Sequence, residues 1–290
     1  MQDASMKTKL LLSLFILRAL AGAAHGVEDV KISPDLVYGH KDGMAMTMDL
    51  YKPKDPNGAG VLFIISGGWY SRWWAPDPNA WYFKALLEAD FTLYAVRHGS
   101  SPKYKVPEMI EDLHRAVRFV RLHARKQGVD PDRLGITGAS AGGHLSLLLG
   151  TTADGGNPKA KDKILRQSNR VAAIVAVCPP SDLREWAKPT SEYHKKFPAL
   201  RFDLGKAVAC SPVLQASKDD PPMLMIHGDK DVTVPIAHSQ KMAEALREKG
   251  VTAKVHVIKD AGHSFKGDDF DNSAEAMVDW FKQYLVAEKK

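Results

Sequence analysis

The chain alternates between runs of consecutive apolar residues and stretches in which apolar residues recur every three or four positions. The first pattern predicts buried strands, and the second predicts helices with one apolar face. We expect strands at 61–65, 91–96, 132–137, 171–177, 223–226 and 253–258, and helices at 82–89, 107–126, 239–249 and 274–287 with another beginning at 143. Residues 45–51 alternate and predict an amphipathic strand near an edge, after a polar opening from residue 27. Strands that alternate with helices indicate an α/β fold with a mostly parallel central sheet and helices on both faces.

The pattern shows no internal repeat and no linker, so it predicts one domain over residues 27–290. Within it, residues 179–222 are irregular and rich in Pro, Lys and Asp. We interpret this segment as a cap-like insertion of helices and loops.

The first 26 residues have the layout of a secretory signal peptide. A short basic start at Met6–Lys9 precedes an apolar stretch at 10–20, and small residues follow at 21–26. This order predicts cleavage after Ala24 or Gly26, and therefore a secreted or periplasmic protein without stable membrane association after removal of the signal. An uncleaved membrane tether is the alternative, because Arg18 interrupts the apolar stretch. No later segment is long enough to span a bilayer.

Composition narrows the function classes. Apolar residues make up 44% of the 290, enough for a substantial core, and the net charge of +6 comes from interspersed charges of both signs. No basic block is interleaved with aromatic residues, so nucleic-acid binding is not expected. Cys178 and Cys210 could pair in an exported protein or remain two buried thiols. Neither cysteine has enough ligands nearby for a metal, so no metal or cofactor is expected.

The segment Gly138-Ala139-Ser140-Ala141-Gly142 has the pattern Gly-x-Ser-x-Gly between a predicted strand and a predicted helix. A sharp turn in this context lifts a serine hydroxyl clear of the sheet, and the glycines allow strand and helix to approach closely. An ordinary glycine-rich turn is the alternative, but the flanking segments favour a nucleophile.

Other chemically active residues follow other strands. Asp231 lies after the strand at 223–226, His263 after the strand at 253–258, and Ser66-Gly67-Gly68-Trp69 after the strand at 61–65. Because active sites in open parallel sheets lie beyond the carboxyl ends of the strands, all of these are expected on one rim. The chain order Ser…Asp…His suits this architecture.

These residue types fit nucleophilic catalysis. A serine hydroxyl needs a base, for which His263 is suited, and the imidazole needs an orienting carboxylate, for which Asp231 is suited. The oxyanion of a tetrahedral intermediate needs preorganised N–H donors, and the backbone N–H groups of Gly68, Trp69 and Ala141 are the candidates. Asp229 and Asp260 are interpreted as turn or loop residues, and His144 and His227 as packing or loop support.

Taken together, these motifs resemble the α/β-hydrolases, specifically the branch of hormone-sensitive-lipase-like and feruloyl/acetyl-xylan esterase-like enzymes. The resemblance covers nearly all of residues 27–290 and implies an α/β-hydrolase fold with the insertion over the active site. It also implies that Asp231, rather than Asp229, is the acid of the triad. The matching stretches are 104–107 with Glu111-Asp112, 128–134, 138–144, Ser211-Pro212, 219–222, 227–231 and 262–263.

The chain departs from that family's pattern at two places. The oxyanion loop is Ser66-Gly67-Gly68-Trp69 where the family usually has His-Gly-Gly-Gly or His-Gly-Gly-Ala, although main-chain donors can survive this change. Ala139 precedes the nucleophile where the lipase-like branch often has an acidic residue, which favours the feruloyl/acetyl esterase-like group.

Aromatic residues after the oxyanion loop suggest a substrate. The aromatic cluster could contact an aryl group or a sugar ring, or simply pack the loop onto the fold, and its first four members are the predicted substrate-binding residues. The cluster consists of Trp69, Tyr70, Trp73, Trp74, Trp81 and Tyr82. We predict a serine esterase for small esters or acylated saccharides, with acetyl or feruloyl esters of polysaccharide as the hypothesis. The alternatives are a prolyl-oligopeptidase-like peptidase and a non-catalytic binding protein on a hydrolase scaffold.

Overall fold

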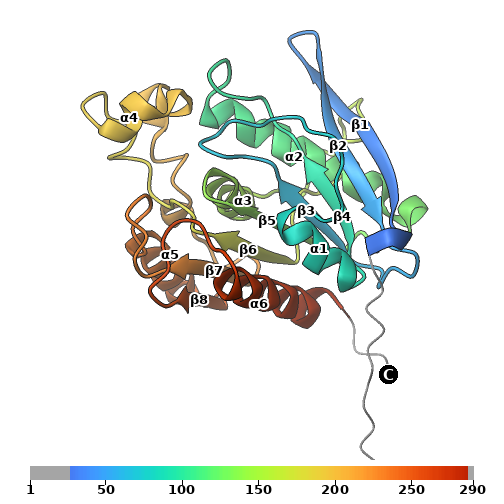
Figure 1. Cartoon of the computed structure of the whole chain (residues 1–290). Coiled ribbons are helices and arrows are strands. Elements are labelled where there is room, and N and C mark those ends of the chain that lie inside the picture. Colours follow the sequence, from blue (N-terminus) through green and yellow to red (C-terminus); the bar gives the residue numbers. More distant parts are fainter. Residues whose placement is uncertain (1–26, 287–290) are drawn as a thin grey trace, which may run out of the picture.

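The computed structural model describes residues 27–286, which build one eight-stranded sheet (Figure 1). The strand order is β1-β2-β4-β3-β5-β6-β7-β8. β1 and β2 are antiparallel to their neighbours, and β4, β3, β5, β6, β7 and β8 pair in parallel. The predicted mostly parallel sheet is therefore confirmed. The strands are β1 (Lys31–Lys41), β2 (Met44–Lys52), β3 (Gly60–Ile64), β4 (Thr92–Val96), β5 (Leu134–Ala139), β6 (Ala173–Val177), β7 (Met223–Gly228) and β8 (Ala253–Ile258).

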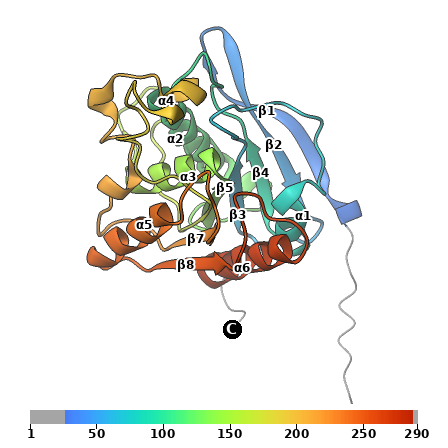
Figure 2. The same ribbon diagram turned by 60° about the vertical axis from the view of Figure 1, so that its left-hand side comes forward.

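Helices cover both faces of the sheet and enclose two cores. α2, α3 and α5 bury their apolar sides in one core, and α1 and α6 bury theirs in the other (Figure 2). None of the helices within residues 27–286 is both long and apolar enough to cross a membrane. The helices are α1 (Trp81–Glu88), α2 (Val106–His123), α3 (Ala141–Thr151), α4 (Glu192–Lys196), α5 (Ala237–Glu248) and α6 (Asp268–Leu285), and the 3₁₀ turns are Val27–Asp29, Ala124–Gln127, Pro198–Leu200, Leu204–Lys206 and Pro212–Leu214.

Two segments differ most from the sequence-based expectation. The polar opening contains β1, an edge strand in which only two of the eleven residues are buried, so it lacks an apolar run. α6 begins at Asp268 rather than at residue 274. Its first turn carries Asp268, Asp269 and Asp271, which favour a helix N-terminus electrostatically but add nothing to an apolar periodicity.

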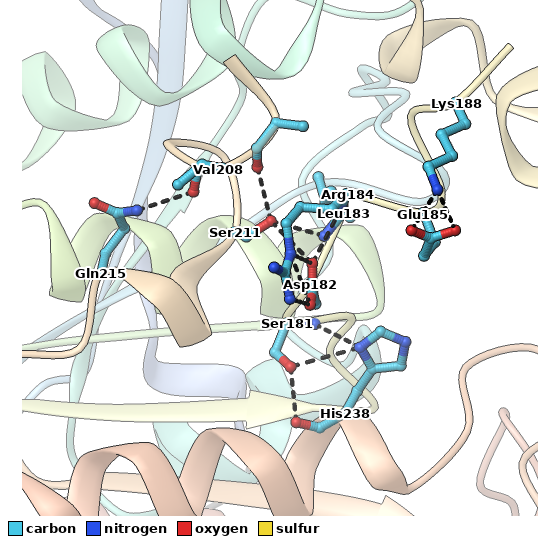
Figure 3. A network of polar contacts seen from close by, with 11 residues as sticks. Ser181, Asp182, Leu183, Arg184, Glu185, Lys188, Val208, Ser211, Gln215 and His238 are labelled. Carbon is cyan, nitrogen blue, oxygen red and sulfur yellow. Dashed lines mark hydrogen bonds and ion pairs between the residues drawn. The ribbon is translucent and has the colours of Figure 1, made fainter. Parts of the chain in front are cut away.

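The segment 179–222 lies between β6 and β7 as α4 and three 3₁₀ turns, and it forms a lobe beside α3 and α5 (Figures 1 and 2). Polar contacts fix its start to α5 (Figure 3). The Ser181 N–H donates to Nδ1 of His238 at 3.1 Å, and the Ser181 hydroxyl donates to the His238 carbonyl at 2.8 Å. The Leu183 N–H donates to Ser211 Oγ at 2.8 Å, which ties the two ends of the lobe together.

Both cysteines are buried free thiols, so of the two alternatives for Cys178 and Cys210 the structure shows the unpaired one. The expected signal peptide at residues 1–26 lies outside the described residues.

Candidate active site

Ser140 lies in a sharp turn between β5 and α3. Its backbone has φ 55° and ψ −117°, a strained conformation for a residue with a side chain. The turn is possible because glycines flank it: a Cβ on Gly138 would lie 2.6 Å from the carbonyl carbon of Gly142, and a Cβ on Gly142 would lie 2.8 Å from the Ile64 carbonyl oxygen. The strained turn thus places the serine at the carboxyl end of the sheet, at the N-terminus of α3.

The loops after β7 and β8 bring a carboxylate and an imidazole to this serine. Nε2 of His263 lies 2.9 Å from Ser140 Oγ, and Nδ1 of His263 lies 2.7 Å from Asp231 Oδ2. The three side chains expected on one rim therefore form one hydrogen-bonded series. Asp229, the other acidic residue of the β7 loop, instead accepts a hydrogen bond from the Asp260 N–H at 2.7 Å.

The carboxylate of Asp231 is fully buried and surrounded by donors. Its Oδ1 accepts hydrogen bonds from the Thr233 N–H at 2.8 Å and the Val234 N–H at 2.9 Å. Burial opposes ionisation, but the hydrogen bonds from His227, His263 and the Val234 backbone outweigh it and hold the pKa of Asp231 below its usual range. Asp231 is therefore a fixed negative charge beside the Nδ1 of His263.

His227 lies behind Asp231, and its two nitrogens have different partners. Nε2 is 2.8 Å from the Val234 carbonyl, which can only accept, so Nε2 carries the proton and also faces Asp231 Oδ2 at 3.2 Å. Nδ1 is 2.7 Å from the Ser239 hydroxyl. This arrangement makes His227 a support for the Asp231 loop and leaves proton transfer to His263.

Cys178 lies beside Asp231 and His227, although the sequence indicated too few potential metal ligands near either cysteine. Atoms of Cys178, His227 and Asp231 that could ligate a metal lie within 4.8 Å of one another. However, burial first and the nearby Asp231 second raise the pKa of the Cys178 thiol to about 12, and both nitrogens of His227 are hydrogen-bonded. This cluster therefore suits the support of a carboxylate better than metal binding. The sequence could have indicated that Cys178 lies near the site, because Cys178 directly follows β6 and so lies on the same rim as the triad.

The predicted oxyanion loop is a tight turn over residues 67–70. Gly67 and Tyr70 exchange two backbone hydrogen bonds of 3.0 Å, and the central residues Gly68 and Trp69 have φ of 56° and 63°. Positive φ at both central positions is the signature of a type I′ turn. Within residues 27–286, the N–H groups of Gly68 and Trp69 donate to no protein acceptor. Ala141, the third predicted donor, begins α3, where backbone N–H groups lack intrahelical partners.

The ring of Trp69 fixes this turn to α3. It is 1% exposed and lies edge-on to both His144 and Phe197. Its Nε1–H donates to Nδ1 of His144 at 3.3 Å, while Nε2 of His144 faces the Cys210 carbonyl at 2.8 Å. Burial lowers the pKa of His144 to about 4, so the imidazole is neutral and can accept this bond.

A cavity of about 280 Å³ opens beside the turn. Of the four aromatic residues expected to contact substrate, Tyr70 and Trp74 line it, whereas Trp69 is buried in the fold and Trp73 is 61% exposed outside it. Trp81, a further member of the predicted aromatic cluster, also lines the cavity. Its remaining lining residues are Ile65, Ser66, Gly67 and Arg72.

The lobe at 179–222 contacts both halves of this site. The ring of Phe197 lies about 3.0 Å from where a Cβ on Gly68 would be, and the Tyr193 hydroxyl donates to the Thr233 carbonyl at 3.0 Å. The same segment thus touches the oxyanion turn and the loop that carries Asp231.

Comparison with known proteins identifies the family of this chain. A model of the BD-FAE family matches residues 48–246, more than half of the chain. The chain belongs to the BD-FAE family. Among curated proteins it is similar to the probable carboxylic ester hydrolase LipM of Mycobacterium tuberculosis, with 29% identity over 74% of this chain and 51% of LipM. It spans about half the length of the curated relatives that it matches.

Solved structures show the same fold. One is the acetyl ester-xyloside bifunctional hydrolase of Caldicellulosiruptor lactoaceticus, with TM-score 0.75, 25% identity, and coverage of 87% of this chain and 96% of that one. Another is a truncated carbohydrate esterase from gut microbiota, with TM-score 0.72, 26% identity, and coverage of 87% and 95%. The predicted α/β-hydrolase fold and the resemblance to its esterases are confirmed.

Proposed function

We propose that this BD-FAE family member is a serine esterase that cleaves carboxylic esters through an acyl-enzyme. The observation that carries the proposal is the series from Ser140 through His263 to Asp231, with contacts of 2.9 and 2.7 Å. In this reaction His263 takes the proton of Ser140 as the hydroxyl attacks the ester carbonyl, and then gives it to the leaving alcohol. Water, activated by the same imidazole, releases the acid.

The surrounding backbone stabilises the charge that develops. The N–H groups of Gly68, Trp69 and Ala141 are the proposed donors to the oxyanion, and such donors are most effective when they are fixed before the reaction begins. Trp69 provides this rigidity, because its buried ring ties the turn to α3. The replacement of the usual histidine by Ser66 leaves these main-chain donors in place.

For the substrate, we propose an acetyl or feruloyl ester on a polysaccharide, met outside the cell or in the periplasm. Two features support this choice. Tyr70, Trp74 and Trp81 give the cavity flat apolar walls, which suit sugar and aryl rings. The names of similar solved structures include a carbohydrate esterase and an acetyl ester-xyloside hydrolase.

The test compares wild type with Ser140→Ala on 4-nitrophenyl acetate and butyrate. Wild type should hydrolyse both esters, and Ser140→Ala should lose at least about 10³-fold in kcat. The esterase proposal would be refuted if the wild-type protein were inactive or if Ser140→Ala kept full activity. Methyl ferulate, acetylated xylan and aminoacyl-4-nitroanilides then identify the substrate, and cleavage of the anilides alone would favour the peptidase alternative.

A further inference from the structure

A second hollow, about 650 Å³ in volume, lies between α1 and α6. Its shape follows from small residues at a spacing of four. Ala85 of α1 and Ala89, the residue after its end, follow Trp81, and on α6 Ala274 and Val278 follow Phe270. Residues four apart lie on the same side of a helix, so these positions open a continuous groove. From residue 270 to residue 282 the groove extends for about 18 Å along α6.

The groove begins at the catalytic rim. Both α1 and α6 follow strands of the parallel sheet (Figure 1). Their first residues therefore lie at its carboxyl end, as Ser140 and His263 do. Trp81 lines this groove and also the cavity beside the oxyanion turn, and its ring centroid is 5.8 Å from that of Trp74. The two hollows therefore meet at one aromatic side chain, which is 61% exposed.

The chemistry of the groove fits a neutral polyhydroxylated chain. Apolar and aromatic side chains line its floor, and acidic, basic and amide side chains that can form hydrogen bonds line its rim. The sugar rings of such a chain have flat apolar faces and hydroxyl groups around their edges. The faces can pack against aromatic rings of the groove, and the hydroxyl groups can form hydrogen bonds with its polar side chains. The polar lining residues are Asn79, Lys84, Glu88, Asp271, Glu275 and Lys282.

We propose that the groove between α1 and α6 binds the glycan chain whose ester is cleaved at Ser140, several sugar units away from the ester. This inference rests on the proposed esterase function and extends it from the ester bond to the polymer. The ester-bearing unit occupies the cavity at Tyr70 and Trp74, and the chain passes Trp81 into the groove. The groove should therefore matter for long substrates and not for short ones.

The test blocks the groove far from the ester. Val278→Arg places a long charged side chain on the floor, and Val37→Arg, at an exposed position of β1, is the matched control. The readout is kcat/KM on acetylated xylan divided by kcat/KM on 4-nitrophenyl acetate. This ratio should fall about tenfold in Val278→Arg and stay at the wild-type value in Val37→Arg.

Direct binding gives a second readout. With Ser140→Ala as the background, the affinity for xylohexaose measured by calorimetry should fall about tenfold when Val278→Arg is added. An unchanged ratio and affinity would overturn the groove proposal, and so would a change of oligomeric state in Val278→Arg, which would make the groove a contact between copies. If wild type fails on 4-nitrophenyl acetate, the esterase proposal fails, while xylohexaose binding still decides for or against the groove.

Discussion

At the scale of single residues, the site depends on the buried carboxylate of Asp231, whose ionised form is stabilised by its hydrogen bonds. Asp231 has hydrogen-bond donors on both oxygens, from two backbone N–H groups and two imidazoles. This arrangement holds Nδ1–H of His263 toward Asp231 and leaves Nε2 free to take the proton of Ser140. The carboxylate thereby determines which nitrogen acts as the base.

Replacement of this carboxylate by its amide should therefore stop catalysis without unfolding the protein. In Asp231→Asn the fixed charge beside His263 is lost, and kcat on 4-nitrophenyl acetate should drop by about 10³- to 10⁴-fold. Asp229→Asn, two residues away on the same loop, is the matched control and should stay within about threefold of wild type. Equal losses in the two variants would mean that the loop, rather than the carboxylate, is what matters.

The two thiols should be inert despite the closeness of Cys178 to Asp231. Burial raises the pKa of Cys178 to about 12 and that of Cys210 to about 11, and only the thiolate is reactive. Native protein treated with iodoacetamide at pH 8 should keep its activity, and mass spectrometry should find no alkylation. Unfolding in urea should expose both cysteines to the reagent. Rapid labelling of the folded chain with loss of activity would contradict this picture.

At the scale of elements, the positions of the catalytic loops depend on close contacts between strand ends. A Cβ on Gly228, the last residue of β7, would lie 2.2 Å from the Ala261 carbonyl oxygen. The same carbonyl accepts the Lys230 N–H at 2.9 Å, so this contact links the loop of Asp231 to the loop of His263. Because Gly228 has no side chain, the loop of Asp231 and the loop of His263 can approach this closely.

Gly228→Ala should separate these loops. We expect the free energy of unfolding to fall by about 1–3 kcal/mol, as for an overpacked core position, and kcat to fall at least tenfold. Gly262→Ala is the matched control, because a Cβ there meets nothing within 4 Å. Urea denaturation and the 4-nitrophenyl acetate assay measure both effects. A Gly228→Ala protein as stable and active as Gly262→Ala would show that the loops tolerate separation.

The elements also show what the sequence could reveal. Strands buried on both faces have continuous apolar runs, and the parallel arrangement sends the residues after them to one rim. Ser140, Asp231 and His263 could therefore be placed together without a structure. β1 has only two buried residues, so its sequence contains no continuous apolar run from which the strand could be predicted. The roles of Cys178 and of the individual tryptophans depend on which way a side chain points after a turn, and sequence spacing does not determine that.

At the scale of the whole molecule, burial of imidazoles makes stability dependent on pH. Burial lowers the pKa of four histidines to about 4: His98, His114, His144 and His238. In the unfolded chain a histidine titrates near 6.5, so between about pH 6.5 and 4 the unfolded state binds more protons than the folded state. The folded state is favoured fully above this window and loses stability as the pH falls through it.

The free energy of unfolding should consequently be several kcal/mol lower at pH 5 than at pH 7, with about 2 kcal/mol from each fully buried imidazole. Urea denaturation at a series of pH values measures this slope. His98→Gln removes one buried imidazole, so its slope should be shallower than that of wild type whatever its absolute stability. His40→Gln, at an exposed position of β1, should keep the wild-type slope. Parallel curves for wild type and His98→Gln would mean that His98 does not contribute to the loss of stability in acid.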